Sequence, residues 1–309
     1  MTELLDRRLI FITGKGGVGK STVAIALGLV AARRGLRTIV AELHSQERVQ
    51  GTFAQHGARF RELELVPGLF SISIDAERAM EEYLRVKAGA VGRAVGASRV
   101  FHAFALATPG MRELLSMGKV WELAQLHRRT RGAAPYDVVI VDAPATGHGV
   151  GMLRTPKTFA EIARVGPIAQ QGRQIAAMIY DRDRTAVVAV ATPEEIPVSE
   201  TLSLRESLEH EHLALDLVIA NAVYPTRFES DQVGVLERAL ARSEEPLARS
   251  ALRAALSEHA RTQTQRAQLD RLRIGLNLDG GVIELPFLFA ETLDRAELER
   301  LADLLEVQL

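Results

Sequence analysis

The sequence contains no cysteine, few lysines and no long apolar run. Without cysteine the chain can form no disulfide, iron–sulfur cluster or thiolate metal site. The segment from Met1 to Arg8 is polar, and no stretch approaches the ~20 apolar residues that a membrane span requires. These absences predict a cytoplasmic protein without stable membrane insertion.

The charge of the chain is nearly balanced, with a net charge of −1 at neutral pH. That balance gives no overall reason to expect binding to nucleic acid or to anionic membranes. With 309 residues, of which 47% are hydrophobic and 25% charged, the chain can bury a sizeable core. We therefore expect a soluble enzyme with no nucleic-acid partner.

Lysine is scarce, and its placement is uneven. Of the 38 Lys and Arg residues only five are lysines, and two of these, Lys15 and Lys20, lie in the octet Gly14 to Ser21. The octet reads Gly-Lys-Gly-Gly-Val-Gly-Lys-Ser, between the apolar run Leu9 to Ile12 and a helix-like stretch from Thr22 to Arg34. A compact ammonium fits among phosphate oxygens better than a planar guanidinium does. This context favours a phosphate-binding loop, hereafter the phosphate loop, over an ordinary glycine-rich turn.

The phosphate loop predicts how a nucleotide is held. Its glycines let the backbone turn tightly and point N–H groups at a triphosphate, beside the positive end of the following helix. Lys20 is expected to reach the β- and γ-phosphates, and the Ser21 hydroxyl is expected to ligate Mg²⁺. The residues predicted to contact the nucleotide here are Gly14, Gly16, Gly17, Val18, Gly19, Lys20, Ser21 and Thr22.

A carboxylate ends another apolar strand. The run from Val138 finishes at Asp142, and Gly147 follows shortly afterwards. If this strand lies beside the phosphate loop, Asp142 can hold Mg²⁺ directly or through water, and Gly147 gives its loop freedom to move with the γ-phosphate. The alternative is a strand that ends in an ordinary turn. We expect Ser21 and Asp142 to form the metal site.

Apolar, β-rich runs alternate with helical patterns along the chain. The runs occupy residues 9–13, 38–42, 69–74, 138–142, 186–191, 217–222 and 282–286. Several are continuous enough to be buried on both faces, as in a parallel sheet. The alternation predicts an α/β fold with a doubly wound, mostly parallel sheet and ligands at the carboxyl ends of the strands. We expect one domain over residues 1–309, with residues 76–131 and 155–182 as an inserted helical subdomain.

The phosphate loop, with Lys15 near its start, resembles the deviant Walker A loop of one class of P-loop ATPases. That class includes the arsenite-pump ATPases, the tail-anchored-protein targeting ATPases, the Min and Par partitioning ATPases and the nitrogenase iron protein. In the class, the early lysine reaches the partner's nucleotide across a dimer interface. The resemblance implies ATP as the nucleotide and a nucleotide-driven dimer in which Lys15 and Lys20 are catalytic. An ordinary solvated charge is the alternative for Lys15.

Asp142 to His148 narrows the resemblance to the arsenite-pump and targeting branch, whose switch segment reads Asp-Thr-Ala-Pro-Thr-Gly-His. This chain has alanine and proline in a different order within the same spacing. Asn221 matches the asparagine that reads adenine in the branch, although an asparagine after a strand is by itself more often a turn residue. Pro286 lies in a segment that resembles the loop closing over the base. The resemblance therefore adds Asn221 and Pro286 to the expected ATP site.

One position departs from the branch. Where the branch carries Asp-Pro-Ala-His, with the aspartate positioning the attacking water, this chain reads Glu42-Leu43-His44-Ser45. Glu42 keeps the carboxylate but moves its oxygens by about 1.5 Å, and a misplacement of that order can cost ~100-fold in rate. Three interpretations of Glu42 follow. It is an adapted catalyst that works slowly, or the chain is a regulatory subunit of a heterodimer that binds ATP without hydrolysing it, or Glu42 is a strand-end residue without a role in catalysis.

Two apolar stripes stand in the expected helical insertions. Met111, Leu114, Met117, Trp121 and Ala124 recur at helical spacing and predict one apolar helix face. A second stripe consists of Phe159, Ile162 and Val165. Such stripes usually form core.

The resemblance offers another use for these stripes. In the targeting ATPases, equivalent insertions of two subunits form a methionine-rich groove for a transmembrane helix. The resemblance therefore implies a homodimer, or a heterodimer with a related ATPase subunit, that handles a hydrophobic protein segment and meets a membrane receptor. A metalloid-pump ATPase without cysteine ligands is the remaining alternative.

Overall fold

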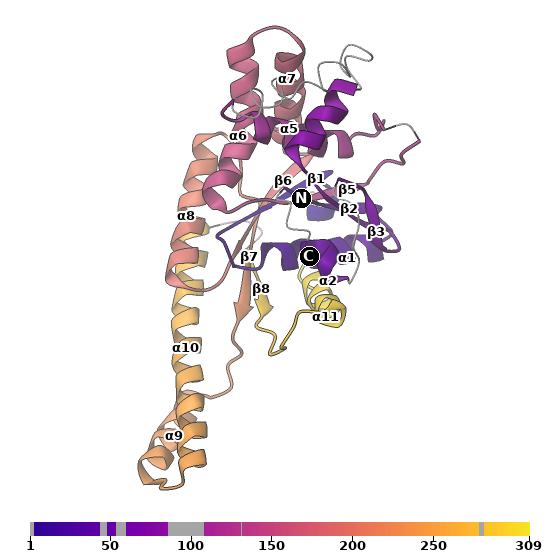
Figure 1. The fold of residues 1–309 in the computed structure, drawn as a ribbon. Coiled ribbons are helices and arrows are strands. Elements are labelled where there is room, and N and C mark those ends of the chain that lie inside the picture. The colour runs from indigo at the N-terminus through magenta and orange to yellow at the C-terminus, as the bar shows by residue number, and fades with distance from the viewer. Residues whose placement is uncertain (1–2, 44–47, 54–59, 86–107, 131, 278–280) are drawn as a thin grey trace.

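The computed structural model describes residues 3–43, 48–53, 60–85, 108–130, 132–277 and 281–309. His44 and Ser45 lie outside these residues, as does much of the expected insertion 76–131. Figure 1 shows a central twisted sheet with helices on both faces, which confirms the predicted α/β class.

The sheet has eight strands in the described residues, in the order β3-β4-β2-β5-β1-β6-β7-β8. Neighbouring strands are parallel there except for β3 and β4, which pair antiparallel. All seven predicted runs form strands. Their bounds are β1 (Leu9–Thr13), β2 (Thr38–Glu42), β4 (Leu69–Ser73), β5 (Val138–Asp142), β6 (Thr185–Ala191), β7 (Leu217–Val223) and β8 (Val282–Pro286).

The sequence analysis missed the edge strand β3 (Leu63–Val66). Its four residues are too few to give a periodic signal, and Leu65 is the one that is buried. Gly68, with φ of 85°, makes the tight turn that returns the chain into β4. A short antiparallel edge strand closes an otherwise parallel sheet.

Helices cover both faces of the sheet. The described helices are η1 (Leu4–Asp6), α1 (Lys20–Arg33), α2 (Arg48–Thr52), α5 (Met111–Leu123), α6 (Thr146–Ala163), α7 (Pro167–Ile179), α8 (Glu195–His210), α9 (Ser230–Arg242), α10 (Pro246–Leu276) and α11 (Arg295–Glu306). Residues 76–85 are also helical. One core joins the sheet to α1 and α11, and the other joins it to α5, α6, α7, α8 and α10.

The C-terminal helix α11 packs against α1. Leu298, Leu301 and Leu305 are each at most 2% exposed, and burying a leucine side chain contributes about 1.5–3 kcal/mol. Asp294 caps the helix, because its Oδ1 accepts hydrogen bonds from two backbone N–H groups of the first turn. The apolar stripe of this helix is therefore core.

Helices α5, α6 and α7 stand together at one end of the sheet (Figure 1). The first predicted stripe is core, since Leu114, Met117 and Ala124 are buried and Met111 and Trp121 pack against them. The second predicted stripe is only partly core. Phe159 packs against the core, whereas Ile162 is 75% and Val165 81% exposed.

A helical hairpin, which the sequence analysis did not identify, extends beyond the sheet. Figure 1 shows the long helix α10 running past the sheet, with α9 beside its far end. Pro246 starts α10, Glu245 caps it by accepting from two backbone N–H groups, and Asn277 in the left-handed region ends it. Leu269, Leu272 and Leu276 are buried at its sheet-facing end. One end of α10 is thus anchored in the core, and the other carries α9.

Candidate nucleotide site

The phosphate loop joins β1 to α1, as predicted. A Cβ at Gly14, where φ is 146°, would lie 2.1 Å from the backbone oxygen of Val190 on β6. Gly19 has φ of 93° and stands directly before α1. Glycine at these two positions lets the loop pass close to the sheet and turn into the helix. The amino end of α1 therefore faces the space that the loop encloses.

Lys20 lies across the phosphate loop. Its Nζ donates hydrogen bonds to the backbone oxygens of Gly14, at 3.0 Å, and of Lys15, at 2.9 Å. These bonds hold the ammonium over the loop, where the oxygens of a bound phosphate would meet it. Val18, by contrast, buries its side chain, so its part in the loop is played by the backbone.

Ser21 and Asp142 meet at the end of the loop. Ser21 Oγ donates a hydrogen bond to Asp142 Oδ2 at 2.6 Å. A hydroxyl and a carboxylate in contact are hard oxygen ligands of the kind that Mg²⁺ takes when phosphates and water complete its shell. The two side chains that the sequence assigns to the metal therefore lie together and fit Mg²⁺.

Glu42 stands beside Asp142, because the two residues are direct partners in the β2–β5 pairing. Glu42 is 3% exposed, and its Oε1 accepts a hydrogen bond from the backbone N–H of Val49 at 3.2 Å. A carboxylate at the carboxyl end of a central strand, next to the metal ligand, is well placed for chemistry at the phosphates.

One cavity of about 490 Å³ gathers these groups. It is lined by Gly16, Gly17, Gly19, Lys20, Ser21, Thr22, Ile25, Glu42, Thr52, Asp142, Ala143, Pro144, Ala145, Leu293 and Leu298. Leu293 and Leu298, which come from the C-terminal part, were not predicted. No local pattern marks them as site residues, because only the fold brings them to the loop.

Asn221 also reaches the phosphate loop, although neither Asn221 nor Pro286 lines the cavity of about 490 Å³. The Nδ2 of Asn221 donates to the Val18 backbone oxygen at 2.9 Å. A Cβ at Gly19 would come within 2.2 Å of that nitrogen. Pro286 is paired with Val223 at the end of β7. It lines a neighbouring cavity of about 520 Å³, between β7, β8 and α10.

Lys15 points away from its own loop. Its Nζ lies 2.8 Å from Glu200 Oε1 on α8, and both side chains are about one third exposed, at 35% and 38%. Lys15 and Glu200 line an open hollow of about 980 Å³ between α6 and α8. The two lysines of the phosphate loop thus occupy different places, Lys20 over the loop and Lys15 on an outer face.

The segment after Asp142 differs from the expected loop. Helix α6 already begins at Thr146, so Gly147 lies in its first turn. The backbone N–H of His148 donates to Ala145, which starts the helix at the point where the sequence suggested a freely moving glycine.

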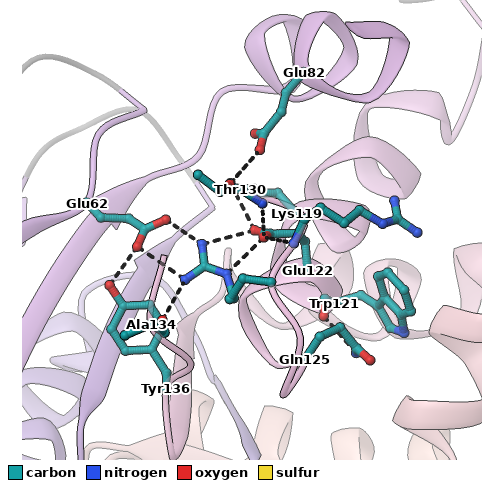
Figure 2. Close-up of polar contacts among 11 residues, drawn as sticks. Glu62, Glu82, Lys119, Trp121, Glu122, Gln125, Thr130, Ala134 and Tyr136 are labelled. Carbon is teal, nitrogen blue, oxygen red and sulfur yellow. Dashed lines mark hydrogen bonds and ion pairs between the residues drawn. The ribbon is translucent and has the colours of Figure 1, made fainter. Parts of the chain in front are cut away.

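A second charged cluster lies outside the nucleotide site. This cluster, here called the Arg128 cluster, consists of Glu62, Glu82, Lys119, Glu122, Arg128 and Tyr136. The Arg128 side chain is fully buried and pairs with Glu62 at 2.6 Å and with Glu122 at 2.8 Å. Lys119 lies 3.0 Å from both Glu82 and Glu122. Figure 2 shows Tyr136, Lys119 and three glutamates converging from different elements.

Pairing decides the charge state of the Arg128 cluster. Burial alone would raise the pKa of Glu122, but hydrogen bonds and charges from Arg128 and Lys119 outweigh it and hold that pKa below its ordinary value. The pKa of Glu62 is lowered in the same way, against burial, by Arg128 and Tyr136. Burial and the neighbouring Glu62 raise the pKa of Tyr136. Glu62 and Glu122 are therefore ionised and Tyr136 is neutral at pH 7.

Among the described residues, no three or more His, Asp or Glu side chains gather into a group that could hold a metal ion. The helices in that part of the chain also include none that is both long and apolar enough to cross a membrane.

The phosphate loop, the Ser21–Asp142 pair and the mostly parallel sheet are arranged as a P-loop fold requires, and comparison with known proteins identifies the family. The model of the anion-transporting ATPase family, ArsA_ATPase, matches residues 7–171 and 162–245. The chain belongs to this family, which confirms the family inferred from the sequence.

Individual relatives of this chain are also named as ATPases. The ATPase BagA of Mycobacterium tuberculosis (strain H37Rv) is 31% identical over 236 residues, which cover 74% of this chain and 68% of the relative. The ATPase GET3 of Paracoccidioides lutzii is 22% identical, over 99% of this chain and 93% of the relative. The ATPase get3 of Sclerotinia sclerotiorum is 22% identical over 75% of this chain and 77% of the relative.

Proposed function

We propose that this chain is a Mg²⁺-dependent ATPase that works in the cytoplasm as an ATP-gated dimer. The observation that carries the proposal is the gathering of Lys20, Ser21, Glu42 and Asp142 around one cavity at the carboxyl edge of the sheet. Membership of an ATPase family supports it. The nature of the partner, a second copy or a related subunit, is left to experiment.

Each group has a distinct task in the proposed reaction. Lys20 and the amide groups of the phosphate loop bind the β- and γ-phosphates and stabilise charge that develops there during transfer. Ser21 and Asp142 hold Mg²⁺, which offsets the charge of the phosphates. Glu42 orients the attacking water. Asn221 and Pro286 lie toward the base, and Lys15 completes the partner's site.

The orientation of Lys15 supports the dimeric part of the proposal. Its ammonium contacts Glu200 on an outer hollow rather than its own phosphate loop. A lysine placed there meets phosphates only if a second subunit approaches that face. Exchange of Glu200 for a phosphate would then accompany closure.

The proposed cargo is a hydrophobic segment of a membrane protein. An apolar cavity of about 150 Å³ lies between residues 76–85, α5 and α7, and Met80 and Met111 line it. Ile162, Val165 and Ile168 are exposed at the nearby turn from α6 to α7. Flexible thioethers and an exposed apolar patch suit apolar partners of varied shape.

A regulatory role without hydrolysis is the second candidate, and one contact favours it. The carboxylate of Glu42 accepts a hydrogen bond from the Val49 backbone, which engages one of its two oxygens. Such a subunit would bind ATP and close without turning it over.

ATP turnover by the purified chain separates the two candidates. Glu42→Gln is expected to keep ATP affinity within about twofold and to abolish turnover, since the amide is a poor acceptor for the water's proton. Glu237→Gln, on the exposed surface of α9, is the matched control. Equal turnover by Glu42→Gln and the parent would show that another residue positions the water. A parent that binds ATP with no turnover would favour the regulatory role.

A further inference from the structure

Gln265 on α10 holds the end of β7 with both ends of its amide. Its Oε1 accepts a hydrogen bond from the Tyr224 backbone N–H at 2.7 Å, and its Nε2 donates to the Ala222 backbone oxygen at 3.2 Å. A backbone N–H can only donate and a carbonyl can only accept, so these partners fix the orientation of the amide. Gln265 is 6% exposed. A buried glutamine thus forms hydrogen bonds with the backbone on both sides of Val223.

The backbone at the end of β7, which Gln265 contacts, is irregular. The pairing of β7 with β8 shifts register between Ala220 and Val223. Ala222 has φ of 61°, in the left-handed region that alanine rarely adopts. A residue with a Cβ stays in that conformation only where its surroundings enforce it. The two hydrogen bonds from Gln265 supply such enforcement.

The irregularity lies directly beside the phosphate loop. Asn221 precedes Ala222 in the chain, and its Nδ2 donates to the Val18 backbone oxygen. Oδ1 is the only acceptor of this amide, and the hydrogen bond from Nδ2 to Val18 fixes the face of the amide on which Oδ1 lies. An acceptor at this place favours the 6-amino group of adenine and disfavours the 6-oxo group of guanine. The bulge that Gln265 holds therefore sets where this acceptor lies.

We propose that Gln265 is a positioning residue of the nucleotide site, which sets the preference for adenine by holding the β7 bulge and thereby orienting Asn221. The inference rests on the proposed ATP binding. In the described part of the chain, the hydrogen bonds of the Gln265 side chain go to the backbone of Ala222 and Tyr224 and not to the phosphate loop. It acts on the base through Ala222 and Asn221, and it leaves the phosphate contacts to Lys20 and the loop.

Thr262 provides a matched control. It lies one turn before Gln265 on α10 and is 3% exposed. Both residues line the cavity of about 520 Å³ between β7, β8 and α10. Its hydroxyl donates to the Glu258 backbone oxygen within its own helix, not to β7. Thr262→Val therefore perturbs the packing of α10 on the sheet without releasing the bulge.

The test compares ligands with and without a base. Calorimetry with Mg²⁺ measures the binding of ATP, GTP and inorganic tripolyphosphate to the full chain and to Gln265→Met, which keeps the side-chain length but loses the amide. ATP affinity is expected to fall roughly tenfold, with tripolyphosphate affinity within about twofold of the parent and a smaller preference for ATP over GTP. Thr262→Val should bind all three as the parent does.

Three results would overturn the inference. They are unchanged ATP affinity in folded Gln265→Met, an equal loss for ATP and tripolyphosphate, and the same loss in Thr262→Val. If Gln265→Met does not fold, Gln265→Glu takes its place, because it keeps the acceptor for Tyr224 and loses the donor to Ala222. A parent chain that binds neither ATP nor tripolyphosphate would instead refute the proposed function.

Discussion

The phosphate loop and the Arg128 cluster are both dense in polar groups, yet they are built in opposite ways. The loop is eight consecutive residues whose backbone turns around a cavity. The Arg128 cluster collects side chains from five separate stretches of the chain, and its charges are paired with one another. A site that binds a ligand through one loop can be encoded by consecutive residues. A cluster whose charges pair with one another depends on the whole fold.

The comparison also separates two uses of basic residues. Arg128 donates hydrogen bonds to Glu62 and Glu122 at once, as the fixed fork of a guanidinium allows. Lys20 donates its hydrogen bonds to backbone oxygens of the phosphate loop. In the proposed complex it would donate to phosphate oxygens instead. We therefore expect loss of Arg128 to affect stability, and loss of Lys20 to affect binding.

The largest expected effect is that of Arg128→Ala. Removing the guanidinium leaves Glu62 and Glu122 as buried charges without their main partner, which should lower the free energy of unfolding by about 3–5 kcal/mol. Urea unfolding measures this change. Arg295→Ala, which breaks an exposed pair with Glu299, should cost about 0–1 kcal/mol. A loss in Arg128→Ala no greater than in Arg295→Ala would contradict the buried-pair account.

Lys20→Ala is expected to act the other way, on binding more than on folding. It removes a charge-assisted contact to phosphate worth about 1.5–3 kcal/mol, so ATP affinity should fall roughly tenfold or more. Calorimetry with ATP and Mg²⁺ measures it, with Lys157→Ala on α6 as the lysine control. Unchanged affinity in Lys20→Ala would remove the phosphate-loop interpretation.

A smaller effect is the pH dependence of stability from the Arg128 cluster. The pKa values of Glu62 and Glu122 are lower in the folded chain than their ordinary value of 4.5. As the pH falls below about 4.5, the unfolded chain therefore takes up protons first, and stability present above that pH is lost until the folded pKa values are passed. Tyr136→Phe, which removes a hydrogen bond to Glu62, should make the loss shallower in urea unfolding across this range. An identical pH slope in the two proteins would speak against this assignment.

The sequence predicted those parts of the molecule that are encoded by neighbouring residues. Seven strands follow from apolar runs, because each strand buries consecutive residues in a parallel sheet. The phosphate loop and Asp142 follow from strand ends, because the topology brings those ends together. Glu42 was expected at the end of its strand, and the pairing of β2 with β5 sets it beside Asp142.

The rest depends on contacts between distant segments. The strand β3 is too short to show a period. Gly147 was expected in a loop that moves with the γ-phosphate, but it lies in the first turn of α6. Ile162 follows an apolar stripe yet lies exposed, since no neighbour in the described part of the chain covers it. Gln265 could not be found at all, because its importance comes from a bulge that lies 43 residues away.

The central claim, an ATP-gated dimer completed by Lys15 of the partner, is tested most directly by mixing two inactive variants. Lys15→Ala keeps its own phosphate contacts but cannot complete the other site, and Lys20→Ala does the reverse. In a mixed dimer the intact Lys15 serves the intact Lys20 site, so part of the lost ATP turnover should return. No recovery of turnover, together with a Lys15→Ala protein that still dimerises on ATP as the parent does, would contradict the account.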